Sequence, residues 1–243
     1  MIIGLRRAAG AMVIAALVLV IVLAALAGLR AKPQDLPWAP LHLGEPTGLF
    51  TGRKLAGLPR DGVKCAALLR EAGVRFEPAK PIKDGEACGY ADGVRFAAGG
   101  SRRITLAPAD PVMACPVAAG MAMWEWNVVQ PAARRYLGAP VVAIEQLGTY
   151  NCRAIRGDAR VWSEHSTADA IDVSAFRLAD GTRVVVTDDW QGDGPRATFL
   201  HVVRNGACGL FATVLSPEYN AAHHNHLHLD QAARGSMGWR ACR

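Results

Sequence analysis

The chain has 243 residues, a net charge of +6 and a pI near 9.2, and 51% of its residues are hydrophobic. This composition is that of a globular protein with a sizeable core and excludes a disordered or low-complexity chain. The positive charges are scattered, without a block of Lys and Arg and without interleaved aromatic residues, which argues against a nucleic-acid-binding protein.

An apolar segment dominates the N-terminus. Arg6 and Arg7 precede an uncharged run over residues 8–29, which is long enough to span a bilayer as a helix. We expect residues 1–30 to be an uncleaved membrane anchor, with Ala25-Leu26-Ala27 as the cleavage motif of the alternative, a signal peptide. The first case gives an inner membrane-anchored periplasmic domain, and the second gives a protein secreted to the periplasm.

Six cysteines follow the apolar segment. None of them forms a Cys-x-x-Cys motif, so neither a zinc ribbon nor a thioredoxin-type site is indicated. An even number of cysteines behind an export signal predicts disulfide bonds in an oxidising compartment. The sequence alone does not choose among the possible pairings of Cys65, Cys88, Cys115, Cys152, Cys208 and Cys242.

The exported part of the chain divides into a linker and one domain. Residues 31–60 carry five prolines and few periodic apolar positions, which predicts a linker. We expect the domain to extend over residues 61–243, with an N-terminal elaboration over 61–110 and a core over 111–243.

Apolar periodicity predicts the elements of this domain. Helical spacing indicates helices over 61–75, 111–137 and 195–203, the second interrupted near Pro131. Short apolar runs indicate strands at 94–96, 104–106, 141–144, 170–176, 182–187 and 226–229, and residues 150–160 are expected to form a polar loop. Together these elements predict an α+β fold in which helices flank a small antiparallel sheet that carries the functional site.

A histidine cluster provides the strongest chemical signal. Four of the seven His residues lie within residues 223–228. On an extended strand, His226, His228 and Asp230 would share one face, and Leu227 and Leu229 would pack behind them. Imidazole and carboxylate are standard zinc ligands, and three protein ligands with a water form the open site of a catalytic zinc ion.

A second group of candidate ligands lies upstream. His165 and Asp172 are separated by small residues that permit a tight turn, so a loop histidine and a strand carboxylate can converge on one ion. Asp172 lies within an apolar run, where a carboxylate is costly unless it is paired or bound to metal. A capping or salt-bridged Asp172 is the alternative. Ser163 and Asp230 are candidates to orient the ligating imidazoles.

The two groups resemble the zinc signature of a metallopeptidase superfamily. Ser163-x-His165-(x)6-Asp172 and His226-x-His228 are similar to motifs of D-Ala-D-Ala carboxypeptidases, lysostaphin-type (hedgehog-like) endopeptidases and penicillin-insensitive murein endopeptidase. The wider run, from about residue 60 to the end, is more similar to the bacterial extensin-like C-terminal domain family. This similarity is carried by Tyr150-Asn151-Cys152-Arg153, Ser163-Glu164-His165, Ala170-Ile171-Asp172, Ala207-Cys208, Tyr219-Asn220 and His226-Leu227-His228-Leu229-Asp230.

The resemblance implies a Zn²⁺ cofactor with three protein ligands, His165, Asp172 and His228. It places His226 in the pocket, where it would help to activate water or stabilise a tetrahedral intermediate. Many relatives carry an acidic general base at the position of Asn225, which cannot take a proton. His226 or His223 must therefore assist the water, or Asp230 must orient one of them.

The resemblance also implies a substrate. Arg153 resembles the residue that binds the substrate carboxylate, a role suited to a guanidinium group, and Arg156 is the alternative. The expected function is a zinc-dependent peptidase, a carboxypeptidase or endopeptidase, acting on peptidoglycan stem peptides or cross-links. Two alternatives remain: a catalytically weak or inactive wall-binding module of the same fold, which Asn225 favours, and a metal-buffering protein that uses the histidine cluster.

Overall fold

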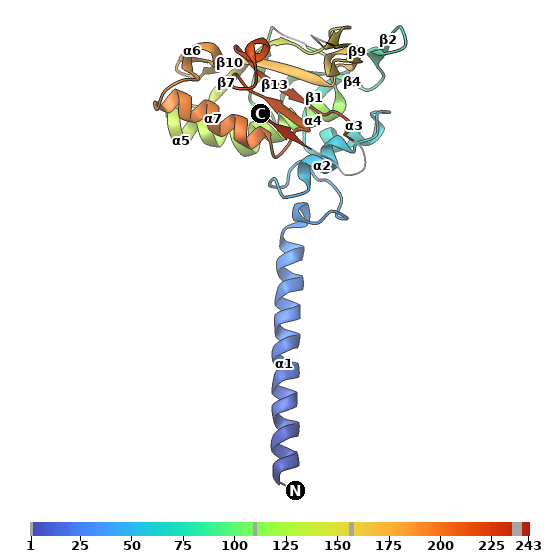
Figure 1. Ribbon diagram of the computed structural model, residues 1–243, viewed down its shortest axis with the longest axis vertical. Coiled ribbons are helices and arrows are strands. Elements are labelled where there is room, and N and C mark those ends of the chain that lie inside the picture. Colours follow the sequence, from blue (N-terminus) through green and yellow to red (C-terminus); the bar gives the residue numbers. More distant parts are fainter. Residues whose placement is uncertain (1, 109–110, 156–157, 235–239) are drawn as a thin grey trace.

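The computed structural model describes residues 2–108, 111–155, 158–234 and 240–243. One α+β domain stands at the end of the long N-terminal helix α1 (Ile2–Ala31) (Figure 1). The apolar window of α1, Gly10–Gly28, has 19 residues and no buried side chains. At 1.5 Å per residue it is about 28 Å long, close to the thickness of the hydrocarbon core of a bilayer. α1 therefore has the length and composition of a membrane anchor or a signal sequence.

The segment over residues 31–60 differs from the expected linker, because it is folded against the domain. It contains the short helices η1 (Pro33–Asp35) and α2 (Thr51–Ala56). Its prolines lie in and around turns, and the leucines between them reach the core without a helical or strand period. The leucines buried in the core are Leu41, Leu43, Leu55 and Leu58.

The N-terminal elaboration consists of one helix and two small sheets. The helix α3 (Val63–Glu71) lies within the range predicted for it and buries Leu68 and Leu69. A three-stranded antiparallel sheet has the order β1 (Val74–Pro78), β4 (Gly93–Gly100) and β6 (Met113–Ala114). The second small sheet is a two-stranded antiparallel hairpin of β2 (Ile82–Asp84) and β3 (Cys88–Tyr90).

The expected helix over 111–137 is interrupted by a π-helical turn. α4 (Cys115–Trp124) runs through the centre of the domain with every side chain buried, and α5 (Gln130–Leu137) follows the π-helical segment η2 (Glu125–Val129). Pro131 has no N–H to donate, and its ring crowds the preceding turn, which explains why the irregular turn lies just before it. The helix α7 (Pro195–Ala207) contacts α5.

The largest sheet has seven strands and positions the site. Its order is β14 (Ala241–Cys242), β12 (Thr213–Leu215), β13 (Leu227–Asp230), β10 (Ala170–Leu178), β7 (Val141–Gly148) and β5 (Thr105–Ala107), and β11 (Arg183–Val185) pairs with β10. The centre is antiparallel, as expected, but the edge pairs β5–β7 and β12–β14 are parallel. The remaining elements are α6 (Val186–Asp189), η3 (Glu164–Thr167) and η4 (Ala221–His223).

The expected polar loop over 150–160 instead contains part of a hairpin, formed by β8 (Ala154–Ile155) and β9 (Asp158–Trp162). Its strand residues Ile155, Val161 and Trp162 are exposed, so the segment lacks the half-buried alternation by which strands are recognised in a sequence.

Three disulfide bonds confirm the prediction from the cysteine count. Each joins segments that are distant in the chain: α3 to α4, β3 to the segment before β8, and the end of α7 to β14. The pairs are Cys65–Cys115, Cys88–Cys152 and Cys208–Cys242.

Candidate metal centre

Two neighbouring strands form the base of the site. β10 and β13 are antiparallel, and Asp172 lies directly opposite His228. Opposed residues in a sheet project to the same face, so the carboxylate and the imidazole meet. The residues next to them project to the other face and are fully buried in the core: Ile171, Val173, Leu227 and Leu229. Strand alternation thus places the polar groups in the site and the apolar groups behind it.

His165 reaches the same place from the short helix η3. The Ser163 hydroxyl accepts a hydrogen bond from the backbone N–H of His165 at 3.3 Å and caps this helix. Ala168 ends it in the left-handed conformation, with φ of 56°, which turns the chain into β10. A non-glycine residue there costs about 1–2 kcal/mol. Burial of the Ala168 methyl group beside Tyr90 and Val112 offsets part of this cost.

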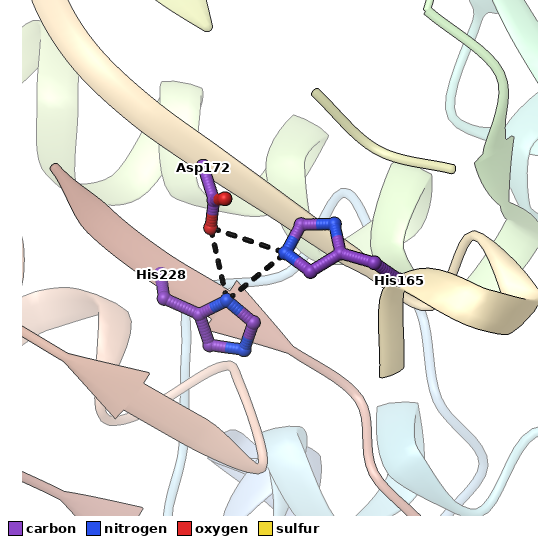
Figure 2. Close-up of side chains that lie close together, drawn as sticks. All are labelled: His165, Asp172 and His228. Carbon is purple, nitrogen blue, oxygen red and sulfur yellow. Dashed lines mark hydrogen bonds and ion pairs between the residues drawn. The ribbon is translucent and has the colours of Figure 1, made fainter. Parts of the chain in front are cut away.

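Three donor atoms converge to form a triangle (Figure 2). His165 Nε2 lies 3.2 Å from both Asp172 Oδ1 and His228 Nδ1, and the last two atoms are 2.9 Å apart. Two ligand atoms bound to one tetrahedral zinc ion are about 3.4 Å apart. The triangle is therefore slightly smaller than the triangle that three ligand atoms of a tetrahedral zinc site would form.

The outer nitrogen of each imidazole also has a partner. His165 Nδ1 donates to the carbonyl oxygen of Thr149 at 2.9 Å, and His228 Nε2 donates to Asp230 Oδ2 at 3.0 Å. These bonds fix the ring orientations and leave the inner nitrogens available to a metal. Asp230 thus contacts the imidazole of His228, whereas Ser163 contacts the backbone of His165.

The charges of the triangle suit a cation. Burial would raise the pKa of Asp172, but hydrogen bonds from His165 and His228 outweigh burial and lower that pKa well below its usual range. Burial also opposes protonation of His228, but its bonds to Asp172 and Asp230 prevail and raise its pKa to about 9. Without metal the site therefore holds a proton on His228, which a metal ion would displace on binding.

Two further histidines flank the triangle. His226 Nε2 lies 3.4 Å from Asp172 Oδ1, and its Nδ1 donates to Asn225 Oδ1 at 2.8 Å. The His223 ring lies 5.2 Å from that of His226 and 5.8 Å from that of His228. Burial, and then the neighbouring histidines, lower the pKa of His223 to about 4, and burial also lowers the pKa of His226. Both rings are therefore neutral near pH 7.

Only one of the two candidate arginines can be placed, because Arg156 lies outside the described residues. Arg153 is exposed, and its backbone carbonyl accepts a hydrogen bond from the N–H of Ser163 at 3.1 Å, beside η3. Its charge is among the groups that lower the pKa of His223, which places the guanidinium within electrostatic reach of the histidines.

No pattern in the sequence predicts the ion pair between Arg60 and Asp169, which lies at the end of the strand pair that carries the site. Arg60 Nη1 lies 2.6 Å from Asp169 Oδ1, and Arg60 Nη2 donates to Asp169 Oδ2 at 2.7 Å and to the carbonyl of Gln231 at 2.9 Å. Asp169 precedes β10 and Gln231 follows β13. Arg60 thus binds both strands of the pair that carries Asp172 and His228, at the one end where β10 begins and β13 ends. Burial raises the pKa of Asp169 to about 7 despite this pairing.

The fold and the site define a class of protein: a disulfide-linked α+β domain behind an apolar helix, with a His–Asp–His cluster on facing strands. Within this class, the chain belongs to the family described as extensin-like protein C-terminus, whose model matches residues 63–243. No curated protein and no solved structure matches the chain. The expected membership of the extensin-like family is confirmed, and the relationship to zinc peptidases stays a prediction.

Proposed function

We propose that the protein is an exported zinc-dependent peptidase that hydrolyses peptidoglycan stem peptides or cross-links. The observation that carries this proposal is the triangle of His165 Nε2, Asp172 Oδ1 and His228 Nδ1, with sides of 2.9–3.2 Å. Two imidazoles and one carboxylate suit zinc, and the outer bonds to Asp230 and to the Thr149 carbonyl are those that ligating histidines make.

Zinc, when bound, would act as a Lewis acid toward water and the scissile carbonyl. The chain itself would supply proton transfer. Since Asn225 Oδ1 accepts a hydrogen bond from the Nδ1–H of His226, the Nε2 atom of His226 carries the lone pair and lies 3.4 Å from Asp172 Oδ1. His223 is held in a similar way by Asn220 Oδ1, at 2.7 Å from its Nδ1. His226 is thus the first candidate for general base, and His223 is the second.

Substrate binding is assigned to Arg153. Its guanidinium is exposed beside η3 and acts electrostatically on His223, so a peptide held by its carboxylate would extend toward the histidines. The peptidoglycan substrate follows from the resemblance to wall peptidases. An exported location agrees with three disulfide bonds, which need an oxidising compartment, and with α1 as an uncleaved anchor in the inner membrane.

The second candidate function is a wall-peptide-binding module without catalysis. Asn225 favours this alternative, because it stands where many related peptidases carry an acidic base and its amide cannot accept a proton. In that case the metal would only hold the side chains of the site in place.

The test is the zinc content of the purified chain together with cleavage of monomeric and cross-linked muropeptides. The variants are His228→Ala and, as a matched control from the same cluster, His224→Ala. His224 is exposed and bonds only to the Ala221 carbonyl, at 2.8 Å. One zinc ion and cleavage that His228→Ala abolishes and His224→Ala preserves would support the peptidase. One zinc ion without cleavage would favour the binding module, and a chain without zinc would overturn both.

A further inference from the structure

We infer that the domain rests on the lipid bilayer through a surface formed by Trp38 and Leu49, which we call the membrane-facing pair. The inference depends on the proposed role of α1 as an uncleaved anchor, and it is independent of the peptidase chemistry. It concerns the side of the domain near α1, away from the metal centre.

Both side chains are unusually exposed for their size. Leu49 is 80% exposed and Trp38 is 76% exposed, the highest values for large apolar residues outside α1 in the described part of the chain. Isolated exposed apolar residues are common and need no explanation. These two are not isolated, however, because the fold brings their segments together.

Hydrogen bonds from the backbone N–H groups of Leu49 and Phe50 join the two segments. The N–H of Leu49 donates to Asp35 Oδ1 at 2.8 Å, and the N–H of Phe50 donates to the carbonyl of Gln34 at 3.1 Å. Leu49 therefore lies beside η1. The last residue of η1, Asp35, comes only three residues before Trp38 in the chain. Both members of the pair thus lie on segments next to η1, the first element after α1.

The pair follows closely in the chain on the segment that would cross the bilayer. The apolar window of α1 ends at Gly28, ten residues before Trp38, and η1 shortens the path between them by turning at Asp35 and Leu36. Figure 1 shows the segment after α1 directly at the end of this helix. The polar zone of a bilayer adds about 5–7 Å on each side of the hydrocarbon core. Tryptophan concentrates in this zone, where its ring meets both apolar and polar surroundings.

The surface is rigid, so lipid contact would orient the domain. Gln34 is 2% exposed, and its side chain donates to the Pro40 carbonyl at 3.3 Å. Lys54 Nζ, from α2, donates to the Pro33 carbonyl at 3.2 Å. Figure 1 shows α2 on the side of the domain nearest to α1, and β9 and β10 on the opposite side. A docked domain would therefore hold the metal centre away from the membrane and toward the wall.

Fluorescence quenching by brominated lipids tests this surface in the full chain. The chain has six tryptophans, and α1 contains none, so any emission quenched by lipid comes from the rest of the protein. The chain would be reconstituted into vesicles of phosphatidylcholine and phosphatidylglycerol, with bromine on the acyl chains near the headgroup or without bromine. The variants are Trp38→Phe and, as a matched control, Trp162→Phe, since Trp162 is 46% exposed but lies on β9.

We expect Trp38→Phe to remove roughly half or more of the emission that bromine quenches, and Trp162→Phe to leave it unchanged. Leu49→Asp, with Trp38 retained, should weaken the quenching, because a charge at the interface lifts the segment from the lipid. Equal quenching in the chain with and without Trp38 would overturn the inference. Flotation separates the two proposals: a chain that floats without quenching at Trp38 keeps the anchor and loses the docked surface, whereas a chain that does not float loses both.

Discussion

Asp230 offers a test of whether His228 is a metal ligand. Its Oδ2 accepts the Nε2 proton of His228 at 3.0 Å, its side chain is 4% exposed, and its Oδ1 accepts the N–H of Ala232 at 3.0 Å. Loss of an outer partner of this kind lowers metal affinity by about 10–100-fold, which corresponds to about 1.4–2.7 kcal/mol. We expect that range for Asp230→Ala. We expect a smaller loss for Asp230→Asn, because the amide oxygen still accepts a hydrogen bond but carries no charge.

The assay is competition for zinc with a chelator of known affinity, at constant pH, on the detergent-solubilised chain. Asp180→Asn is the control, because Asp180 is an exposed turn residue that accepts the N–H of Thr182 and lies outside the site. Near-ultraviolet circular dichroism would establish that each variant is folded. If zinc affinity in Asp230→Ala stays within about twofold of the parent chain, the assignment of His228 as a ligand held through its outer nitrogen is refuted.

Two further predictions concern the arginines on either side of the site. Arg60→Ala should destabilise the domain by about 2–3 kcal/mol, below the 3–5 kcal/mol of a fully buried pair, because the Arg60 side chain is 42% exposed. The pKa of Asp169, already raised to about 7, should rise further without Arg60. The loss of stability in Arg60→Ala should therefore be smaller at low pH, where the carboxyl is neutral, and should grow above about pH 7. Denaturation at about pH 6 and about pH 8.5 measures this difference, and a larger loss of stability at about pH 6 would contradict the prediction. Arg153→Ala should raise KM for peptides with a free carboxylate by about tenfold while leaving the zinc content intact. Arg153→Lys should reverse part of this rise in KM, because it keeps the positive charge. An unchanged KM in Arg153→Ala would remove Arg153 from the substrate site.

The central strands and the two groups of candidate ligands could be predicted from the sequence because their signals are local, whereas the choice of His165, Asp172 and His228 among them came from the family resemblance. In β13, ligand-type residues alternate with leucines, and the period of two assigns them to opposite faces without knowledge of the partner strand. In β10, Asp172 stands out because a carboxylate in an apolar run needs a compensating charge. Once the two strands pair, the meeting of Asp172 and His228 depends only on register.

The features that the sequence did not reveal depend on tertiary structure. Arg60 is separated from Asp169 by 109 residues, and no local pattern marks either residue as half of an ion pair. The partner of His165 is a backbone carbonyl, at Thr149, which any residue type would supply. The segment over 31–60 resembles a linker in composition because its buried leucines fall at irregular intervals between prolines, so only the packed structure assigns them to the core.

The amide at Asn225 bears on the choice between peptidase and binding module. An acidic residue there would act directly on water. Asn225 Oδ1 instead accepts a hydrogen bond from His226 Nδ1, and this bond leaves the lone pair of His226 on Nε2, 3.4 Å from Asp172 Oδ1. The amide therefore orients a neutral imidazole whose pKa burial has lowered, and a neutral imidazole is the form that can accept a proton. The loss of an acidic base at this position thus removes one route for the proton and provides the geometry for another, which is why Asn225 alone does not decide against catalysis.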